Sequence, residues 1–233
     1  MANLITVGRL LLLFIVVGMI YRNPDGLALL SIVLIGVVFA GDGLDGYVAR
    51  RRGSTSPFGA VFDIAGDRVV ETVLWIIFAD LDLIPIWVPL LVVTRGSIVD
   101  ALRSLSYAEG MTAFGEKNMM RSALTRWLTA GRFMRGLYGY AKAVGFVFLT
   151  GLAGYEADRA AETWLTSLYS QEWFRALGWV SVWGSVALTI IRGVPVIIDA
   201  LPYLARPVPS HPVETPVAPP APPAPSRNAG RRG

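Results

Sequence analysis

Residues Gly41–Asp67, GDGLDGYVARRRGSTSPFGAVFDIAGD, hold four aspartates at positions 42, 45, 63 and 67. Apolar runs flank this stretch on both sides, LALLSIVLIGVVFA before it and VVETVLWIIF after it. Ionisable side chains are costly inside a membrane, and where they occur they face the bundle interior and are paired or functional. The stretch therefore poses two questions: whether the chain lies in a membrane, and what four clustered carboxylates bind.

The composition answers the first question. The chain has 233 residues, of which 54% are hydrophobic and 16% charged, whereas soluble domains carry about 25% charged residues. Long apolar runs recur along the chain, which favours an all-α, polytopic membrane protein. The absence of cysteine excludes disulfides and thiolate metal sites. The net charge is +4. In a membrane protein, an excess of Lys and Arg is typical of cytoplasmic loops that meet anionic lipid headgroups, so we expect no nucleic-acid partner.

The apolar runs predict six transmembrane helices. The first run lacks a basic leader and a small-residue cleavage site, so we interpret it as a retained helix and not a signal peptide. After residue 204 the composition becomes proline-rich, which predicts a membrane domain over residues 1–204 and a disordered cytoplasmic tail over 205–233. The six predicted segments are Ile5–Tyr21, Leu27–Ala49, Phe58–Phe78, Ile84–Leu105, Leu137–Tyr155 and Phe174–Leu201.

The charges between these segments predict the orientation. Basic residues gather in ARRRG at Ala49–Gly53 and in Glu109–Arg135, whereas Ala79–Asp82 and Tyr155–Glu162 are acidic. Positively charged loops stay in the cytoplasm. We therefore expect a multi-pass protein of the cytoplasmic (inner) membrane with both termini in the cytoplasm.

The spacing of the aspartates predicts a metal site. Asp42 and Asp45 are an i,i+3 pair and Asp63 and Asp67 an i,i+4 pair, so each pair shares one helix face. In an antiparallel helix pair, Asp45 and Asp63 lie at matched depths of roughly 8 Å below the cytoplasmic end. Four carboxylates together need positive charge, and hard oxygen ligands without His or Cys favour Mg²⁺, Mn²⁺ or Ca²⁺. Two such ions would suit an in-line displacement at phosphorus.

Simpler interpretations exist for the same residues. Arg50, Arg51, Arg52 and Arg68 are near enough in sequence to neutralise the aspartates by salt bridges alone. The small residues at positions 46, 49 and 59 leave room for a ligand beside the helices, but small residues also mediate ordinary packing between membrane helices.

The aspartates and small residues form one motif, which reads Asp42-x-x-Asp45-Gly46-x-x-Ala49-Arg50, eight residues, Gly59-x-x-x-Asp63-x-x-x-Asp67. This motif resembles the signature of the CDP-alcohol phosphotransferase family, in its bacterial phosphatidyl-transferring branch. NLITVGR at the N-terminus also resembles a family element, with Asn3, Thr6 and Arg9 at its fixed positions, although Asn3 and Thr6 are typical helix-capping residues as well. The resemblance covers about residues 3–204.

The resemblance implies transfer of a phosphatidyl group from CDP-diacylglycerol to an alcohol, with release of CMP, in phospholipid biosynthesis. It implies that the four aspartates hold two Mg²⁺ or Mn²⁺ ions and that Asp67 is also the general base. It implies a homodimer. The nucleotide-binding residues that it implies are Asn3, Thr6, Arg9, Gly46, Ala49, Arg50 and Gly59.

The acceptor site is less defined in the sequence. RFMRGLYGYAKAVGF aligns with a family segment S-x-x-G-K-x-K-T, in which Gly139 and Lys142 match, whereas Tyr140 and Ala143 replace a lysine and the threonine. These departures weaken the case for a phosphorylated acceptor. The candidate acceptor-binding residues are Arg95, Arg132, Arg135, Lys142 and Arg192, with loop charge as the alternative for Arg132 and Arg135 and a helix-to-helix ion pair for Arg192.

We predict glycerol 3-phosphate as the acceptor, ahead of inositol phosphate, serine or another alcohol. Two other classes use membrane carboxylates. Prenyltransferases need two separated Asp-rich motifs and more helices than this chain predicts. A divalent-cation transporter would favour polar residues through the whole bilayer depth, whereas these carboxylates gather on one side.

Overall fold

The computed structural model describes residues 2–52, 57–108, 127–128, 131–159 and 163–204. Every regular element among these residues is a helix, which confirms the predicted all-α class. The predicted tail over 205–233 lies outside the described residues. The helices are α1 (Ala2–Arg22), α2 (Ala28–Arg52), α3 (Pro57–Asp80), α4 (Trp87–Ala108), α6 (Arg132–Ala157), α7 (Trp164–Tyr169) and α8 (Glu172–Leu204).

The six predicted segments each coincide with one long helix, and the boundaries differ by a few residues. The short helix α7 was not predicted. Thr163 caps it, because its Oγ1 accepts a hydrogen bond from the Thr166 backbone N–H at 3.3 Å. Six residues are too few for a period of 3.6 to be recognised in the sequence.

The surface of the helices is that of a membrane protein. Three segments, Leu4–Arg22, Phe133–Ala157 and Glu172–Asp199, are long and apolar enough to cross a bilayer. Ala28–Gly41 is a shorter apolar helix segment. Large apolar side chains cover the outside; Leu90, for example, is 61% exposed. Such a surface is stable against lipid and would aggregate in water.

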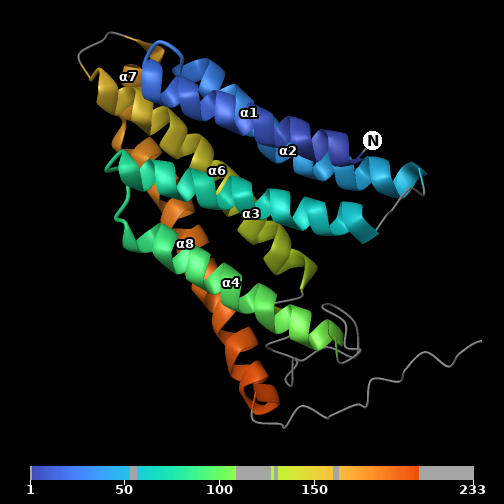
Figure 1. Ribbon diagram of the computed structural model, residues 1–233. Helices are drawn as coiled ribbons and strands as arrows, with labels where there is room; N and C mark the ends of the chain where they lie inside the picture. The colour runs from blue at the N-terminus through green and yellow to red at the C-terminus, as the bar shows by residue number, and fades with distance from the viewer. Residues whose placement is uncertain (1, 53–56, 109–126, 129–130, 160–162, 205–233) are drawn as a thin grey trace, which may run out of the picture.

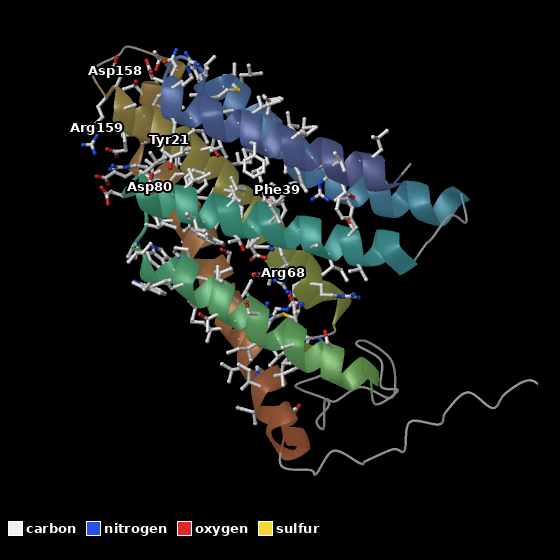
Figure 2. All side chains as sticks on the ribbon, viewed as in Figure 1. Tyr21, Phe39, Arg68, Asp80, Asp158 and Arg159 are labelled. Atoms are coloured by element: carbon white, nitrogen blue, oxygen red, sulfur yellow. The ribbon has the colours of Figure 1, made fainter. Side chains whose placement is uncertain are left out.

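Successive long helices run in alternating directions (Figure 1). The N-terminus lies beside the end of α2 and the start of α3, and the ends of α4 and α8 lie on the same side, away from the α1–α2 turn. At the opposite end, Tyr21 and Asp80 face each other (Figure 2), and the Tyr21 hydroxyl donates to Asp80 at 2.6 Å. Asp82 there adopts φ 56°, a left-handed conformation that ends α3 and turns the chain towards α4.

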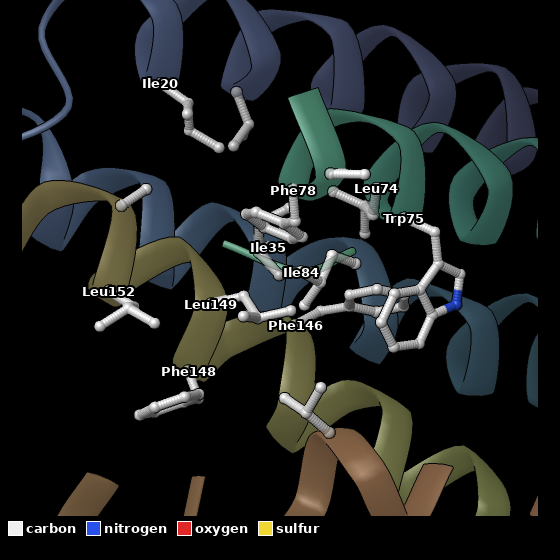
Figure 3. Packing of buried hydrophobic residues seen from close by; sticks show 14 of the residues in the cluster. Ile20, Ile35, Leu74, Trp75, Phe78, Ile84, Phe146, Phe148, Leu149 and Leu152 are labelled. Atoms are coloured by element: carbon white, nitrogen blue, oxygen red, sulfur yellow. The ribbon is translucent and has the colours of Figure 1, made fainter. Parts of the chain in front are cut away.

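The apolar core forms around Phe146 of α6, which α2 and α3 enclose (Figure 3). Its ring stacks on Phe39 at 5.7 Å and on Phe78 at 6.2 Å, and it meets Trp75 edge-to-face at 4.7 Å between ring centroids. Such aromatic pairs contribute about 0.5–1.5 kcal/mol each beyond the area they bury. This core holds α2, α3 and α6 together directly beside the polar residues described next.

Candidate active site

Arg9 joins three helices at the position where the aspartates begin. Its Nη2 donates to Asp67 Oδ1 of α3 at 3.0 Å, and its Nη1 lies 3.7 Å from Asp63 Oδ1. Its Nε donates to the Val38 carbonyl of α2 at 3.0 Å. Arg9 is one of the predicted nucleotide-binding residues. In the structure it also supplies a positive charge to two of the four aspartates.

Two glycines let α1 come this close. A Cβ at Gly41 would lie 3.0 Å from Arg9 Cδ, and a Cβ at Gly66 would lie 2.6 Å from Thr6 Cγ2. Thr6 and Arg9 are both buried as a result. The helix begins at Ala2, so Thr6 lies within the helix and does not cap it.

For most of the other residues predicted to bind the metal or the nucleotide, the structure describes the backbone and not the side chain. Asp42, Asp45, Gly46, Ala49 and Arg50 all lie on α2. Their side chains, and that of Asn3, are outside the described part of the structure, whereas Gly59 lies in the first turns of α3 and is half-buried. Of the predicted four-carboxylate cage, the structure therefore describes the α3 half.

That half fits a hard cation. Asp63 and Asp67 turn to the same side of α3 and approach one guanidinium group, so their oxygens already converge on one positive charge. Carboxylate oxygens are the ligands that Mg²⁺ and Mn²⁺ prefer. Among the described side chains no set of three or more His, Cys, Asp or Glu residues forms a metal site. The other two predicted ligands, Asp42 and Asp45, lie on α2.

A pocket of 420 Å³ is lined both by residues predicted to bind the metal or the nucleotide and by residues of the predicted acceptor motif. Arg9 and Asp67 lie on one wall, and Gly139 and Lys142 of α6 on another. These two pairs belong to separate predicted motifs. The remaining lining residues are Phe39, Val70, Glu71, Tyr140 and Ala143.

Glu71 is the buried carboxylate in this pocket. It accepts a 2.6 Å hydrogen bond from the Tyr138 hydroxyl and lies 3.1 Å from Lys142 Nζ and 3.5 Å from Arg68 Nη1. Thr189 of α8 in turn donates to the Tyr138 oxygen at 3.1 Å. One polar network thus links α3, α6 and α8 inside an apolar bundle, where each partner satisfies groups that would be costly to bury alone.

Arg68 turns away from the aspartate motif. It lies between α3 and α4 (Figure 2) and binds Asp100 with two hydrogen bonds, of 2.9 and 3.1 Å. Such a forked pair of parallel bonds is the strongest geometry available to arginine and a carboxylate. Arg68 therefore fastens α4 to α3. The salt-bridge interpretation named Arg50, Arg51, Arg52 and Arg68. The side chains of the first three lie outside the described residues, and the described cation that contacts Asp63 and Asp67 is Arg9.

The remaining acceptor candidates take different positions. The Arg192 guanidinium of α8 lies 5.1 Å from the centre of the Tyr138 ring, and Arg95 packs so closely on Gly193 that a Cβ there would meet its Cγ at 2.7 Å. Neither is among the residues that line the pocket. Arg135 is exposed at the start of α6. Arg132 is the first residue of α6, with its side chain outside the described set.

Comparison with known proteins agrees with the motif. The sequence profile of CDP-alcohol phosphatidyltransferase matches residues 1–191. The chain belongs to the CDP-alcohol phosphatidyltransferase family. It is also 31% identical over 116 residues to CDP-diacylglycerol–glycerol-3-phosphate 3-phosphatidyltransferase of Pseudomonas fluorescens. That alignment covers 48% of this chain and 59% of the relative.

Glu71 and Phe39 line the pocket and Tyr138 binds Glu71, and none of these three residues was predicted as part of the site. Glu71 carried a signal, because it is a charge within the apolar run VVETVLWIIF and lies one turn after Asp67 on the same helix face. Tyr138 and Phe39 carried none, since aromatic residues are common in membrane helices.

Proposed function

We propose that this family member transfers the phosphatidyl group of CDP-diacylglycerol to glycerol 3-phosphate and releases CMP, as a step of phospholipid biosynthesis. The observation that carries the proposal is that Asp67 and Lys142, which belong to separate predicted motifs, line the same pocket. A carboxylate that can take a proton there lies in the same pocket as an ammonium group that can bind an anionic acceptor. The name of the Pseudomonas fluorescens relative supports glycerol 3-phosphate as that acceptor.

In the proposed reaction the acceptor hydroxyl attacks the phosphorus that bears the diacylglycerol. A new P–O bond forms, the bond to the bridging oxygen of the diphosphate breaks, and CMP leaves with that oxygen. Asp67 accepts the hydroxyl proton at its carboxylate. Its side chain is 47% exposed and borders the pocket, so a substrate hydroxyl has access to it.

We propose Asp42, Asp45, Asp63 and Asp67 as the ligands of two Mg²⁺ or Mn²⁺ ions. Bound there, the ions would neutralise the diphosphate and the negative charge that develops on phosphorus. The convergence of Asp63 and Asp67 on Arg9 supports this ligand set, because it shows two carboxylates arranged around one positive charge.

The nucleotide end of the donor would lie against α1 and α2. Arg9 is at the pocket wall and Thr6 is buried one turn before it. We propose that these two residues bind the cytidine diphosphate. The other proposed contacts are Asn3, Gly46, Ala49, Arg50 and Gly59.

The acceptor would bind on the α6 side. Lys142 would contact its phosphate, and Arg95 and Arg192 would add positive charge from behind Tyr138. Arg132 and Arg135 would attract it at the start of α6. Inositol phosphate, serine or another alcohol remain alternative acceptors with the same chemistry.

We further propose that all six long helices cross the cytoplasmic membrane, with both termini in the cytoplasm and the pocket near that side. The alternating directions of the helices support this topology (Figure 1). We expect a homodimer, which mass measurement of the protein in lipid nanodiscs would test.

The deciding experiment is CMP release by purified protein from CDP-diacylglycerol, with Mg²⁺ or Mn²⁺, across a panel of acceptors. We expect release with glycerol 3-phosphate and a loss of roughly 10²–10⁴-fold in Asp67→Asn, the contribution of a general base. Asp80→Asn, a carboxylate at the opposite end of the bundle, is the control and should keep full activity. Release with another acceptor would correct the substrate. Vesicle uptake of divalent cations without CMP release would contradict the proposed function.

A further inference from the structure

We propose that Glu71 is a positioning residue that holds the Lys142 ammonium at the pocket wall in the place where it meets the acceptor. This inference rests on the proposed function and adds to it. Neither the aspartate motif nor the acceptor motif contains Glu71.

The contacts fix Lys142 at two points. Glu71 Oε2 lies 3.1 Å from Nζ, and the Tyr138 ring lies beneath it, with 4.4 Å between Nζ and the ring centre. Lysine has a flexible four-carbon stem and a compact charge, so its head is placed only as well as its partners place it. With both partners in contact, the ammonium is held next to the pocket.

Glu71 is itself held rigidly. Its side chain is 6% exposed. The Tyr138 hydroxyl donates to Glu71 Oε1 at 2.6 Å, and Arg68 Nη1 lies 3.5 Å from Glu71 Oε2. Tyr138 is buried and receives a hydrogen bond from Thr189 of α8. The position of Lys142 is thus set by residues from α3, α6 and α8.

The ion pair of Glu71 and Lys142 can serve the reaction because Glu71 also borders the pocket, one helical turn after Asp67. The same face of α3 therefore carries the proposed base, Asp67, and the residue that positions the Lys142 ammonium for the acceptor. A purely structural ion pair would need no such placement, since buried pairs are often replaceable by apolar residues without loss of stability.

Glu71→Gln tests the idea directly. Glutamine keeps the side-chain volume and can still accept from Tyr138, but it has no charge for Lys142. We expect the KM for glycerol 3-phosphate to rise by roughly tenfold, the effect of losing one hydrogen bond to a charged group, with the KM for CDP-diacylglycerol unchanged. Glu71→Asp should recover part of the loss, because it restores the charge.

Asp80→Asn is the matched control, because Asp80 also accepts a 2.6 Å hydrogen bond from a tyrosine, Tyr21, far from the pocket. It should change neither KM. An equal rise in both KM values in Glu71→Gln, or a fall in kcat alone, would overturn the positioning role.

A double-mutant cycle separates action through Lys142 from any other effect. Lys142→Met should raise the acceptor KM by itself, and adding Glu71→Gln to it should have no further effect on that KM. Residues in contact show such coupling, whereas independent residues add. Additive effects of the two substitutions would contradict the proposal.

A third measurement does not depend on turnover. The chain has two lysines, Lys142 and Lys117, and Lys117 lies outside the described residues. The acylation rate of Lys142 relative to Lys117, followed by mass spectrometry, should rise several-fold in Glu71→Gln and stay constant in Asp80→Asn. If wild-type protein released no CMP with any acceptor, the proposed function would fail, and this ratio would still decide the role of Glu71. An unchanged ratio would show that Glu71 does not hold Lys142.

Discussion

The Arg9 guanidinium of α1 donates to the Asp67 carboxylate of α3 at 3.0 Å, across 58 positions of sequence. The same guanidinium binds the Val38 carbonyl of α2. Arg9 therefore both fastens three helices and provides positive charge beside two proposed metal ligands. We therefore expect the stability of the bundle to depend on which cations are present.

We expect Arg9→Gln to lower the thermal unfolding temperature more in EDTA than in Mg²⁺. Without Arg9 the aspartates repel one another, and a bound metal would replace the missing charge. Since Asp67 is 47% exposed, solvent screens part of its interaction. The remaining loss in EDTA should be about 1–3 kcal/mol, because the bundle loses the hydrogen bonds of Arg9 to the Asp67 carboxylate and to the Val38 carbonyl. Scanning fluorimetry in both buffers measures it.

Arg22→Gln is the control for that experiment, because Arg22 is exposed at the other end of the same helix. Its unfolding temperature should not depend on metal. An identical loss for Arg9→Gln in EDTA and in Mg²⁺ would disprove the compensation between Arg9 and metal.

Tyr140→Lys should favour a phosphorylated acceptor. Tyr140 borders the pocket and is 72% exposed, so a lysine there would add a second ammonium near Lys142. An exposed charge pair contributes about 1 kcal/mol or less, so the KM for glycerol 3-phosphate should fall by roughly fivefold at most. The KM for serine should be unchanged. Tyr140→Phe removes only the hydroxyl and should leave both values as in wild type; an equal effect of the two substitutions would point to the ring and not to charge.

Gly154→Ala and Gly136→Ala, both in α6, should have opposite effects on stability. A Cβ at Gly154 would lie 2.7 Å from the Pro24 carbonyl oxygen and 2.8 Å from Ala28 Cβ, whereas a Cβ at Gly136 meets nothing within 4 Å. We expect Gly154→Ala to cost about 1–3 kcal/mol by forcing α6 away from the α1–α2 turn. Gly136→Ala should be neutral or stabilising by up to about 1 kcal/mol. Thermal unfolding in detergent would check both, and equal stability of the two variants would argue against this packing.

The proposed topology is testable because the chain contains no cysteine. Ser104, near the end of α4, and Ser170, after α7, are both exposed. In intact cells a membrane-impermeant maleimide should label Ser170→Cys and not Ser104→Cys, and permeabilisation should allow labelling of both. The reverse pattern would place the pocket on the outer side.

The long helices could be predicted because the information for them is local. Apolar runs of bilayer length must form helices, since lipid offers no hydrogen-bond partners to the backbone. Acidic residues at helical spacing likewise predicted that Asp63 and Asp67 would turn to the same side of α3, which their shared contact with Arg9 confirms. The helix α7 was missed because a helix of six residues leaves too little pattern.

The sequence by itself determined the helical class, the positions of the long helices and the membership of the CDP-alcohol phosphatidyltransferase family, because each depends on residues close together in the chain. Only the tertiary structure decided that Arg9 meets Asp67 and that Glu71 holds Lys142. Those pairs depend on how closely helices approach one another. Glycines such as Gly41 and Gly66, and the packing around Phe146, set that approach. The distance between two helices cannot be predicted from the pattern of residues along one of them.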